Sequence, residues 1–269
     1  MKNIKHNLVI GWLYPELMST YGDRGNIICL QKRCEWRGIN VEVKRLDVGF
    51  PYEQLATCHL LFMGGAQDNQ QKIVSHDFSK EKAKELKKMV EDGIPGLYIC
   101  GAYQFLGRYY KEADGTIIKG LGILDLYTEN PGENHERLIG NIVVNARSML
   151  HVARRESSTS HALPATTHLV GFENHGGCTY LGKDVKPLGK VIKGFGNNGT
   201  DGAEGAVYKN SFGSYLHGPI LPKNPVLADL LIKLALEKKY DSPINLSPLD
   251  DSLEIKAQNT IAKRLNIKI

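Results

Sequence analysis

The first hundred residues alternate between strand-like and helix-like patterns, and this alternation constrains the fold more than any other feature. Short apolar runs predict strands at 8–13, 41–46, 60–63 and 96–99. Apolar residues at helical spacing predict helices at 26–37 and 79–92. Strands alternating with helices build a parallel sheet whose functional loops lie at the carboxyl ends of the strands. We therefore predict an α/β fold with a mostly parallel central sheet and helices on both faces.

The second half of the chain is richer in short strands and turns. Further strands are predicted at 123–127, 139–145, 169–172, 191–194, 203–208 and 213–216. Helices are predicted at 224–238 and 253–265, and residues 146–167 are interpreted as a surface excursion. Prolines bound a linker before the last helix, which either packs back on the domain or docks a partner. We predict one domain at 1–240, followed by a C-terminal linker and helix at 241–269.

Composition excludes several classes of protein. The net charge of +5 comes without a basic stripe interleaved with aromatic residues, so no nucleic-acid partner is expected. No segment has the length and apolarity of a membrane span or the pattern of a signal peptide, and we expect a cytoplasmic protein. The five cysteines form no CxxC pair, so neither a disulfide framework nor a metal site is predicted.

A reactive cysteine is predicted where the strand at 96–99 ends. Cys100 is followed by Gly101 and then by a helix-compatible stretch. This is the pattern of a nucleophile elbow, a sharp strand-to-helix turn that holds a nucleophile at the end of a sheet. Backbone N–H groups at such a turn can stabilise a developing oxyanion. The sequence therefore predicts covalent catalysis with Cys100 as the nucleophile.

A cysteine nucleophile needs a base, and His217 is the best placed of the nine histidines. It follows a predicted strand and precedes a Gly-Pro turn, the same kind of location as Cys100. Gly65 ends the strand at 60–63, which we expect to neighbour the strand before Cys100. The N–H groups of Gly65 and Gly101 are predicted to form the oxyanion hole.

Together these residues resemble the class I glutamine amidotransferases, which have a flavodoxin-like fold and hydrolyse glutamine through a cysteinyl thioester. A more specific resemblance is to the GatD family, the glutaminase subunits of lipid II isoglutaminyl synthases, and it spans nearly the whole chain. It is carried by YGDRGNI at 21–27, FMGGAQDNQQ at 62–71, ICGAYQFLG at 99–107, GFENHGG at 171–177, GFGNN at 194–198 and SYLHGPILPKN at 214–224. At the level of the fold the chain is also similar to the amidotransferase domains of cobyric acid synthases.

The resemblance implies roles for individual residues. Cys100 matches the family's nucleophile and His217 its general base. Arg137 matches the substrate-binding arginine, and a guanidinium can hold the α-carboxylate of glutamine by two parallel hydrogen bonds. Gln104, one helical turn after Cys100, is expected to hydrogen-bond the bound amino acid.

One departure from the pattern concerns the third catalytic group. Many class I members place a glutamate two residues after the histidine to orient the imidazole, and here Pro219 occupies that position. A Cys–His pair without a carboxylate should be a poor glutaminase, because the imidazole is less well oriented. We therefore expect either that a partner subunit supplies the carboxylate or that the isolated chain is only weakly active.

The resemblance also implies a partner. Family members work as heterodimers with a Mur-ligase-like subunit of the MurT type, which uses ATP and Mg²⁺ to amidate the D-glutamate α-carboxyl of the lipid II stem peptide to D-isoglutamine. This chain has no GxxxxGK[ST] loop, so we expect no cofactor in it. Lipid II would be reached through the partner, which would bring the complex to the inner face of the membrane.

Three alternatives remain open from the sequence. The chain could serve another acceptor, as in cobyric-acid-type amidation. It could be a cysteine hydrolase on the same fold, acting on peptides or esters. It could also be a catalytically silent subunit that only scaffolds a ligase.

Overall fold

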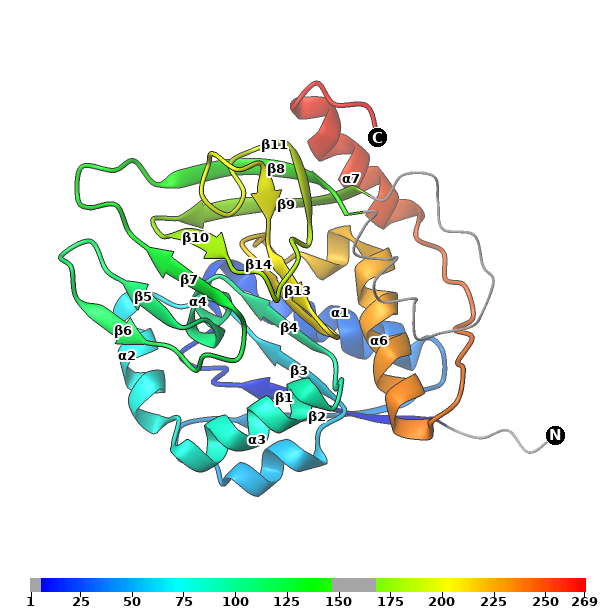
Figure 1. The fold of residues 1–269 in the computed structure, drawn as a ribbon. Coiled ribbons are helices and arrows are strands. Elements are labelled where there is room, and N and C mark those ends of the chain that lie inside the picture. The colour runs from blue at the N-terminus through cyan, green and yellow to red at the C-terminus, as the bar shows by residue number, and fades with distance from the viewer. Residues whose placement is uncertain (1–5, 147–167) are drawn as a thin grey trace.

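A six-stranded sheet lies at the centre of the structure, a computed structural model that describes residues 6–146 and 168–269 (Figure 1). Its strands are β1 (Asn7–Leu13), β2 (Asn40–Leu46), β3 (Leu60–Met63), β4 (Gly96–Ile99), β13 (Ala206–Tyr208) and β14 (Ser211–Ser214), in the order β13-β14-β4-β3-β1-β2. All neighbouring pairs are parallel except β13 and β14, which are antiparallel. The predicted, mostly parallel sheet is confirmed.

Helices cover both faces of this sheet. The helices of the described residues are α1 (Arg24–Glu35), α2 (Asp68–Asp77), α3 (Lys80–Glu91), α4 (Gly101–Leu106), α6 (Pro225–Tyr240) and α7 (Ser252–Arg264), of which α7 lies away from this sheet. The chain moves from β1 to β2 in one direction and from β3 to β4 in the other. Right-handed crossovers then place α1 and α3 on opposite faces, as Figure 1 shows.

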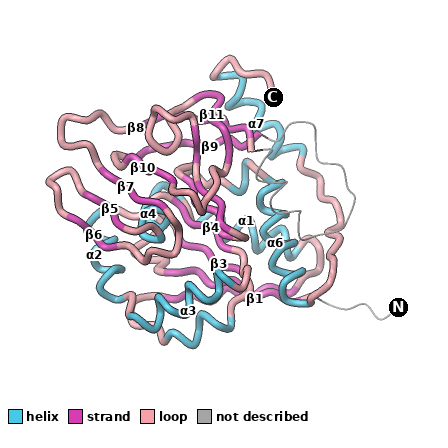
Figure 2. Tube along the Cα trace, viewed as in Figure 1, coloured by secondary structure: helices cyan, strands magenta, loops and turns pink. Residues whose placement is uncertain are grey.

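Two smaller sheets lie beside the central one. One has the order β10-β7-β5-β6 and consists of β5 (Tyr109–Lys111), β6 (Ile117–Lys119), β7 (Leu126–Glu129) and β10 (Cys178–Leu181). The other has the order β12-β11-β8-β9 and consists of β8 (Leu138–Asn145), β9 (His168–His175), β11 (Gly189–Lys193) and β12 (Ala203–Glu204). In Figure 2, α3 lies below the central strands and α6 to their right.

Several predicted elements differ from those observed. Helix α2 and strands β5, β6 and β10 were not predicted. The strand predicted at 123–127 begins only at Leu126, because the N–H groups of Ile123 and Leu124 bond to the carbonyl of Leu106 instead of to a strand. The strand predicted at 203–208 is interrupted at Gly205, whose φ of +65° breaks the extended conformation.

The last helix packs on the domain, which is one of the two roles that the sequence left open. Gln258 donates hydrogen bonds to the carbonyl of His168 and to Asn224 Oδ1, both parts of the domain. The surface excursion predicted at 146–167 falls almost entirely outside the described residues. Within the described ranges, no helix combines the length and the apolarity needed to cross a bilayer.

Candidate active site

Four residues that belong to one site follow the carboxyl ends of parallel strands. Gly65 follows β3, Cys100 follows β4, and Asp23 and His217 lie on the loops after β1 and β14. The order of the strands reverses between β1 and β3, and in open α/β sheets ligands bind at the carboxyl ends beside such a reversal. The topology alone therefore brings these residues to one edge of the sheet.

Cys100 lies at the predicted strand-to-helix turn, between β4 and α4. Its backbone has φ of 51° and ψ of −106°, a conformation that costs free energy for any residue except glycine. Its N–H donates to the carbonyl of Ser214 at 2.8 Å, and its carbonyl accepts from the N–H of Gln104 at 2.9 Å. The sheet and the short helix together hold the strained turn in place.

His217 is held by a different sheet from the one the sequence predicted. Strand β14 ends at Ser214, so His217 is not the direct tip of that strand. Its backbone instead pairs with Phe172 of β9, through one hydrogen bond of 2.8 Å and one of 3.2 Å. The imidazole is completely buried, and the ring of Tyr21 lies edge-on to it at 5.0 Å.

Gly65 shows that the thiol and the imidazole share one pocket. A Cβ atom built on Gly65 would lie 2.7 Å from Cε1 of His217 and 3.4 Å from Cβ of Cys100. The two side chains therefore flank this glycine, and any larger residue would displace the imidazole. The structure thus brings together the nucleophile and the base that the sequence predicted.

The surroundings of His217 favour its protonated form. Burial alone lowers the pKa of His217, since it penalises the charged ring. The neighbouring Cys100 thiolate and the Asp23 carboxylate outweigh burial and raise that pKa to about 10. A protonated imidazole beside a cysteine stabilises the thiolate, which is the nucleophilic form of the side chain.

The sequence analysis missed Asp23, whose carboxylate lies beside His217. Its Oδ1 lies 3.3 Å from Nδ1 of His217, and both side chains are completely buried. The premise that this chain lacks an orienting carboxylate is therefore wrong, because Asp23 lies beside His217. Asp23 lies within the motif at 21–27, but nothing local distinguishes it from the many other aspartates, and only the fold brings it to His217.

The same carboxylate changes the predicted oxyanion hole. The N–H of Gly65 donates to Oδ2 of Asp23 at 2.7 Å, so it is not free to stabilise an oxyanion, contrary to the prediction. The next residue, Ala66, lies directly beside the start of α4, since a Cβ built on Gly101 would lie 2.9 Å from the backbone nitrogen of Ala66. Gly101 begins α4, where N–H groups have no acceptor within the helix.

A cavity of about 440 Å³ opens beside Cys100. Arg137 lines it from the residue before β8, and its guanidinium is held by Asn174, through Oδ1 at 3.0 Å and the carbonyl at 3.1 Å. Gln104 also lines the cavity, but both ends of its amide are engaged, with Gln71 and with the hydroxyl of Tyr215. Gln104 is thus part of a buried network beside the cavity.

A second buried histidine near the cavity does not compete for the role of base. His175 stacks on Tyr215 with ring centroids 3.6 Å apart, and its Nδ1 lies 2.7 Å from the carbonyl of Gly177. Burial lowers its pKa to about 4, so its ring is neutral near neutral pH.

In the described part of the chain, no group of three or more His, Cys, Asp or Glu side chains could hold a metal ion.

Comparisons with known proteins agree with this geometry. Residues 9–225 match the CobB/CobQ-like glutamine amidotransferase domain. The chain is 41% identical to the lipid II isoglutaminyl synthase (glutamine-hydrolyzing) subunit GatD of Staphylococcus aureus strain N315 over 263 residues, which cover 97% of each chain. Identity to the same subunit of Streptococcus pneumoniae strain R6 is 40%, over 93% of this chain and 89% of that protein.

More distant relatives share parts of the chain or the fold alone. The cobyric acid synthase of Desulforamulus reducens is 27% identical over 81% of this chain but only 42% of its own length. A crystal structure of a glutamine amidotransferase superposes with a TM-score of 0.50 at 16% identity, covering 84% of this chain and 98% of that one. That likeness concerns the fold.

Proposed function

Because this chain belongs to the CobB/CobQ-like glutamine amidotransferase family, we propose that it hydrolyses L-glutamine to glutamate and ammonia as the glutamine-hydrolysing subunit of a lipid II isoglutaminyl synthase. The observation that carries the hydrolysis is the arrangement of Cys100, His217 and Asp23 beside a cavity lined by Arg137. Identity to the GatD subunits over nearly the full length of both chains supports the choice of synthase.

The reaction begins at the sulfur. The Cys100 thiolate, formed as His217 takes the thiol proton, attacks the carboxamide carbon of glutamine. Asp23 accepts the hydrogen bond from Nδ1 of His217 and fixes the orientation of the ring, so that Nε2 serves the sulfur. The N–H groups of Gly101 and Ala66 stabilise the oxyanion of the tetrahedral intermediate.

His217 then protonates the departing nitrogen, and ammonia leaves behind a cysteinyl thioester. Water, deprotonated by His217, attacks the thioester carbonyl, and collapse of the second tetrahedral intermediate releases glutamate and restores the thiol. Arg137, oriented by Asn174, binds the α-carboxylate of glutamine throughout.

The ammonia is used by a partner. We propose a Mur-ligase-like subunit of the MurT type that binds ATP and Mg²⁺ and activates the D-glutamate α-carboxyl of the lipid II stem peptide. Attack of ammonia on that activated carboxyl would give D-isoglutamine. This division of labour assigns lipid II, ATP and the metal to the partner and L-glutamine to this chain.

Covalent labelling with a glutamine-analogue diazoketone tests the hydrolysis. We expect one label on Cys100 by peptide mass spectrometry, loss of the label in Cys100→Ala, and its retention in Cys178→Ala, which removes a buried cysteine that does not line the cavity. Ammonia release from L-glutamine should be lost in Cys100→Ala alone. Cleavage of peptides or esters without a response to glutamine would support a different hydrolase.

The acceptor is tested by reconstitution with the Mur-ligase-like subunit. Lipid II amidation should then require ATP, L-glutamine and an intact Cys100, and free ammonium salts should bypass the Cys100→Ala variant. An active glutaminase that never supports lipid II amidation would leave hydrolysis standing and refute the acceptor.

A further inference from the structure

We propose that Asp68 and Gln71, one turn apart on α2, bind the α-ammonium group of glutamine, while Arg137 binds its α-carboxylate in the same cavity. This inference rests on the proposed glutaminase function and adds a specificity site to it. The two residues belong to the motif at 62–71, whose polar positions the catalytic mechanism does not use.

Gln71 is buried at 2% exposure, yet it lines the cavity. Its Nε2 donates to Oε1 of Gln104 at 3.1 Å and faces the carbonyl of Ala66 at 3.5 Å. These two acceptors favour this orientation of the amide, since the reversed amide would place Oε1 of Gln71 against two oxygens, Oε1 of Gln104 and the carbonyl oxygen of Ala66. Among the described residues, Oε1 of Gln71 has no hydrogen-bond partner.

A buried amide oxygen without a partner costs free energy, which a donor on a bound ligand would recover. The rest of the network holds Gln71 in place, because Gln104 is itself anchored to the hydroxyl of Tyr215 at 3.1 Å, and that hydroxyl lies 2.6 Å from Oγ1 of Thr179. A rigid, oriented acceptor of this kind selects a ligand that carries an N–H group.

Asp68 supplies the negative charge. It lies three residues before Gln71, on the same face of the helix, and lines the same cavity. Lys72, one turn away, is paired with Glu112 at 2.9 Å instead. Among the described residues, no ion pair involves the Asp68 carboxylate.

The electrostatics of the cavity match a zwitterion. Burial and nearby Glu112 raise the pKa of Asp68, whereas Lys72, Tyr110 and Arg137 lower it. A cation beside Asp68 would relieve the cost of its burial, and Arg137 in the same cavity needs an anion. An α-amino acid with free amino and carboxylate groups satisfies both, whereas glutamine acylated at its amino group does not.

The test compares two substrates that differ only in the amino group, L-glutamine and its des-amino analogue glutaramate. For the wild type we expect kcat/KM to favour L-glutamine. Asp68→Asn should lower kcat/KM for L-glutamine by about tenfold or more, mainly through KM, and leave that for glutaramate unchanged. Gln71→Leu should also lower the ratio of kcat/KM for L-glutamine to that for glutaramate. It is a second, independent variant in case Asp68→Asn folds poorly.

Asp114→Asn is the matched control, because it removes one carboxylate from the exposed hairpin between β5 and β6, outside the cavity lining. It should leave both substrates unaffected. Equal losses on both substrates in Asp68→Asn and Gln71→Leu would overturn the ammonium site and leave the glutaminase standing. A wild-type chain that releases ammonia from neither compound would overturn the proposed function as well.

Discussion

Nδ1 of His217 lies 3.3 Å from Oδ1 of Asp23, although 194 positions separate the two residues in the chain. The carboxylate is held at its other oxygen by the N–H of Gly65 at 2.7 Å. It is therefore a fixed acceptor for the imidazole, the role that a nearby glutamate has in many class I amidotransferases. This chain therefore has its own carboxylate beside His217.

Replacing this carboxylate should slow catalysis without unfolding the protein. Asp23→Asn retains the shape of the side chain but can present an N–H to Nδ1, which favours the wrong tautomer of His217. We expect kcat for glutamine to fall by about 10²-fold or more. Ammonia release by purified chain, with Asp114→Asn as the control, measures the effect, and a variant with wild-type kcat would exclude Asp23 from catalysis.

The same variant should change the pH profile. The Asp23 carboxylate contributes to the raised pKa of His217, so its removal lowers that pKa. In the variant, His217 then loses its proton at lower pH. The alkaline limb of its kcat/KM profile should therefore shift to lower pH than in the wild type. An alkaline limb at the wild-type position would show that Asp23 does not act on the charge of His217.

Gly65→Ala should damage the site by contact alone. The added methyl would lie 2.7 Å from the His217 ring, a distance that requires the ring to move. A displacement of about 1 Å at a catalytic group can cost about 10²-fold in rate, and we expect a loss of kcat of that order. Gly140→Ala is the control, since nothing lies within 4 Å of its added methyl. Equal activities of the two variants would contradict this role of Gly65.

Glu204→Gln should make the protein more stable at alkaline pH. Glu204 is completely buried, and burial raises its pKa from 4.5 to about 7. Between these values the folded chain retains a proton that the unfolded chain has lost, so stability falls as pH rises through this window. A neutral glutamine can still accept from Ser214 Oγ and from the N–H of Tyr215, which now bond to Oε1 of Glu204.

Above pH 7 we therefore expect Glu204→Gln to exceed the wild type in free energy of unfolding by at most about 3 kcal/mol, with a negligible difference near pH 4.5. Urea denaturation at both pH values measures it. A variant less stable than the wild type at alkaline pH would show that the charged carboxylate is stabilising.

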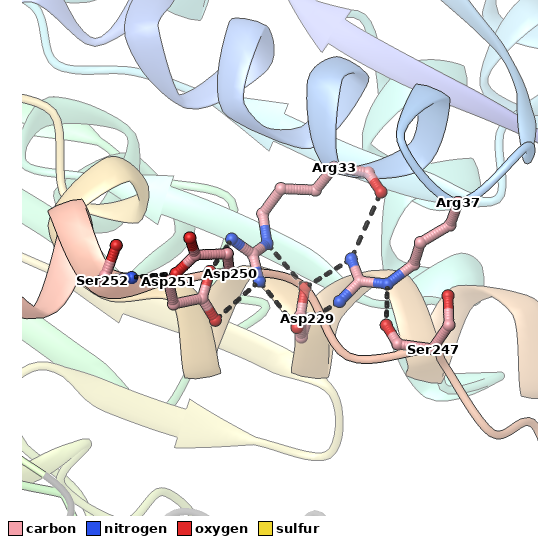
Figure 3. Close-up of polar contacts among 7 residues, drawn as sticks. All are labelled: Arg33, Arg37, Asp229, Ser247, Asp250, Asp251 and Ser252. Atoms are coloured by element: carbon pink, nitrogen blue, oxygen red, sulfur yellow. Dashed lines mark hydrogen bonds and ion pairs between the residues drawn. The ribbon is translucent and has the colours of Figure 1, made fainter.

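Arg33→Met should destabilise the fold far from the active site. The Arg33 side chain is 2% exposed and pairs with Asp229 of α6 at 2.7 Å and with Asp251, just before α7, at 2.6 Å (Figure 3). The substitution removes the Arg33 ion pairs of Asp229 and Asp251, although Arg37 still pairs with Asp229. We expect a loss of about 3 kcal/mol in the free energy of unfolding, measured in urea.

Lys32→Met is the control for that prediction. Lys32 pairs with Glu35 at the surface, where both side chains are about half exposed (54% and 47%), so its loss should cost less than about 1 kcal/mol. Similar losses in the two variants would mean that the buried network of α1, α6 and α7 adds nothing beyond a surface pair.

Local patterns in the sequence were sufficient for the central strands, the turn at Cys100 and the candidate base His217. Apolar runs and glycine turns report local backbone conformation, and parallel strands bring their carboxyl ends to one edge whatever the details of packing. Helix α2 was missed because its polar sequence has no apolar stripe, with only Gln71 and Val74 buried.

Three features are apparent only in the folded chain. They are the contact between Asp23 and His217, the hydrogen bond from the Gly65 N–H to Asp23, and the position of Gln71 Oε1. Each depends on a contact between segments that lie far apart in sequence, and hydrogen bonds of this kind leave no periodic trace in either segment. Periodicity identifies which faces of a helix or strand are buried. Which polar atoms then meet inside the protein depends on how the loops close over the sheet.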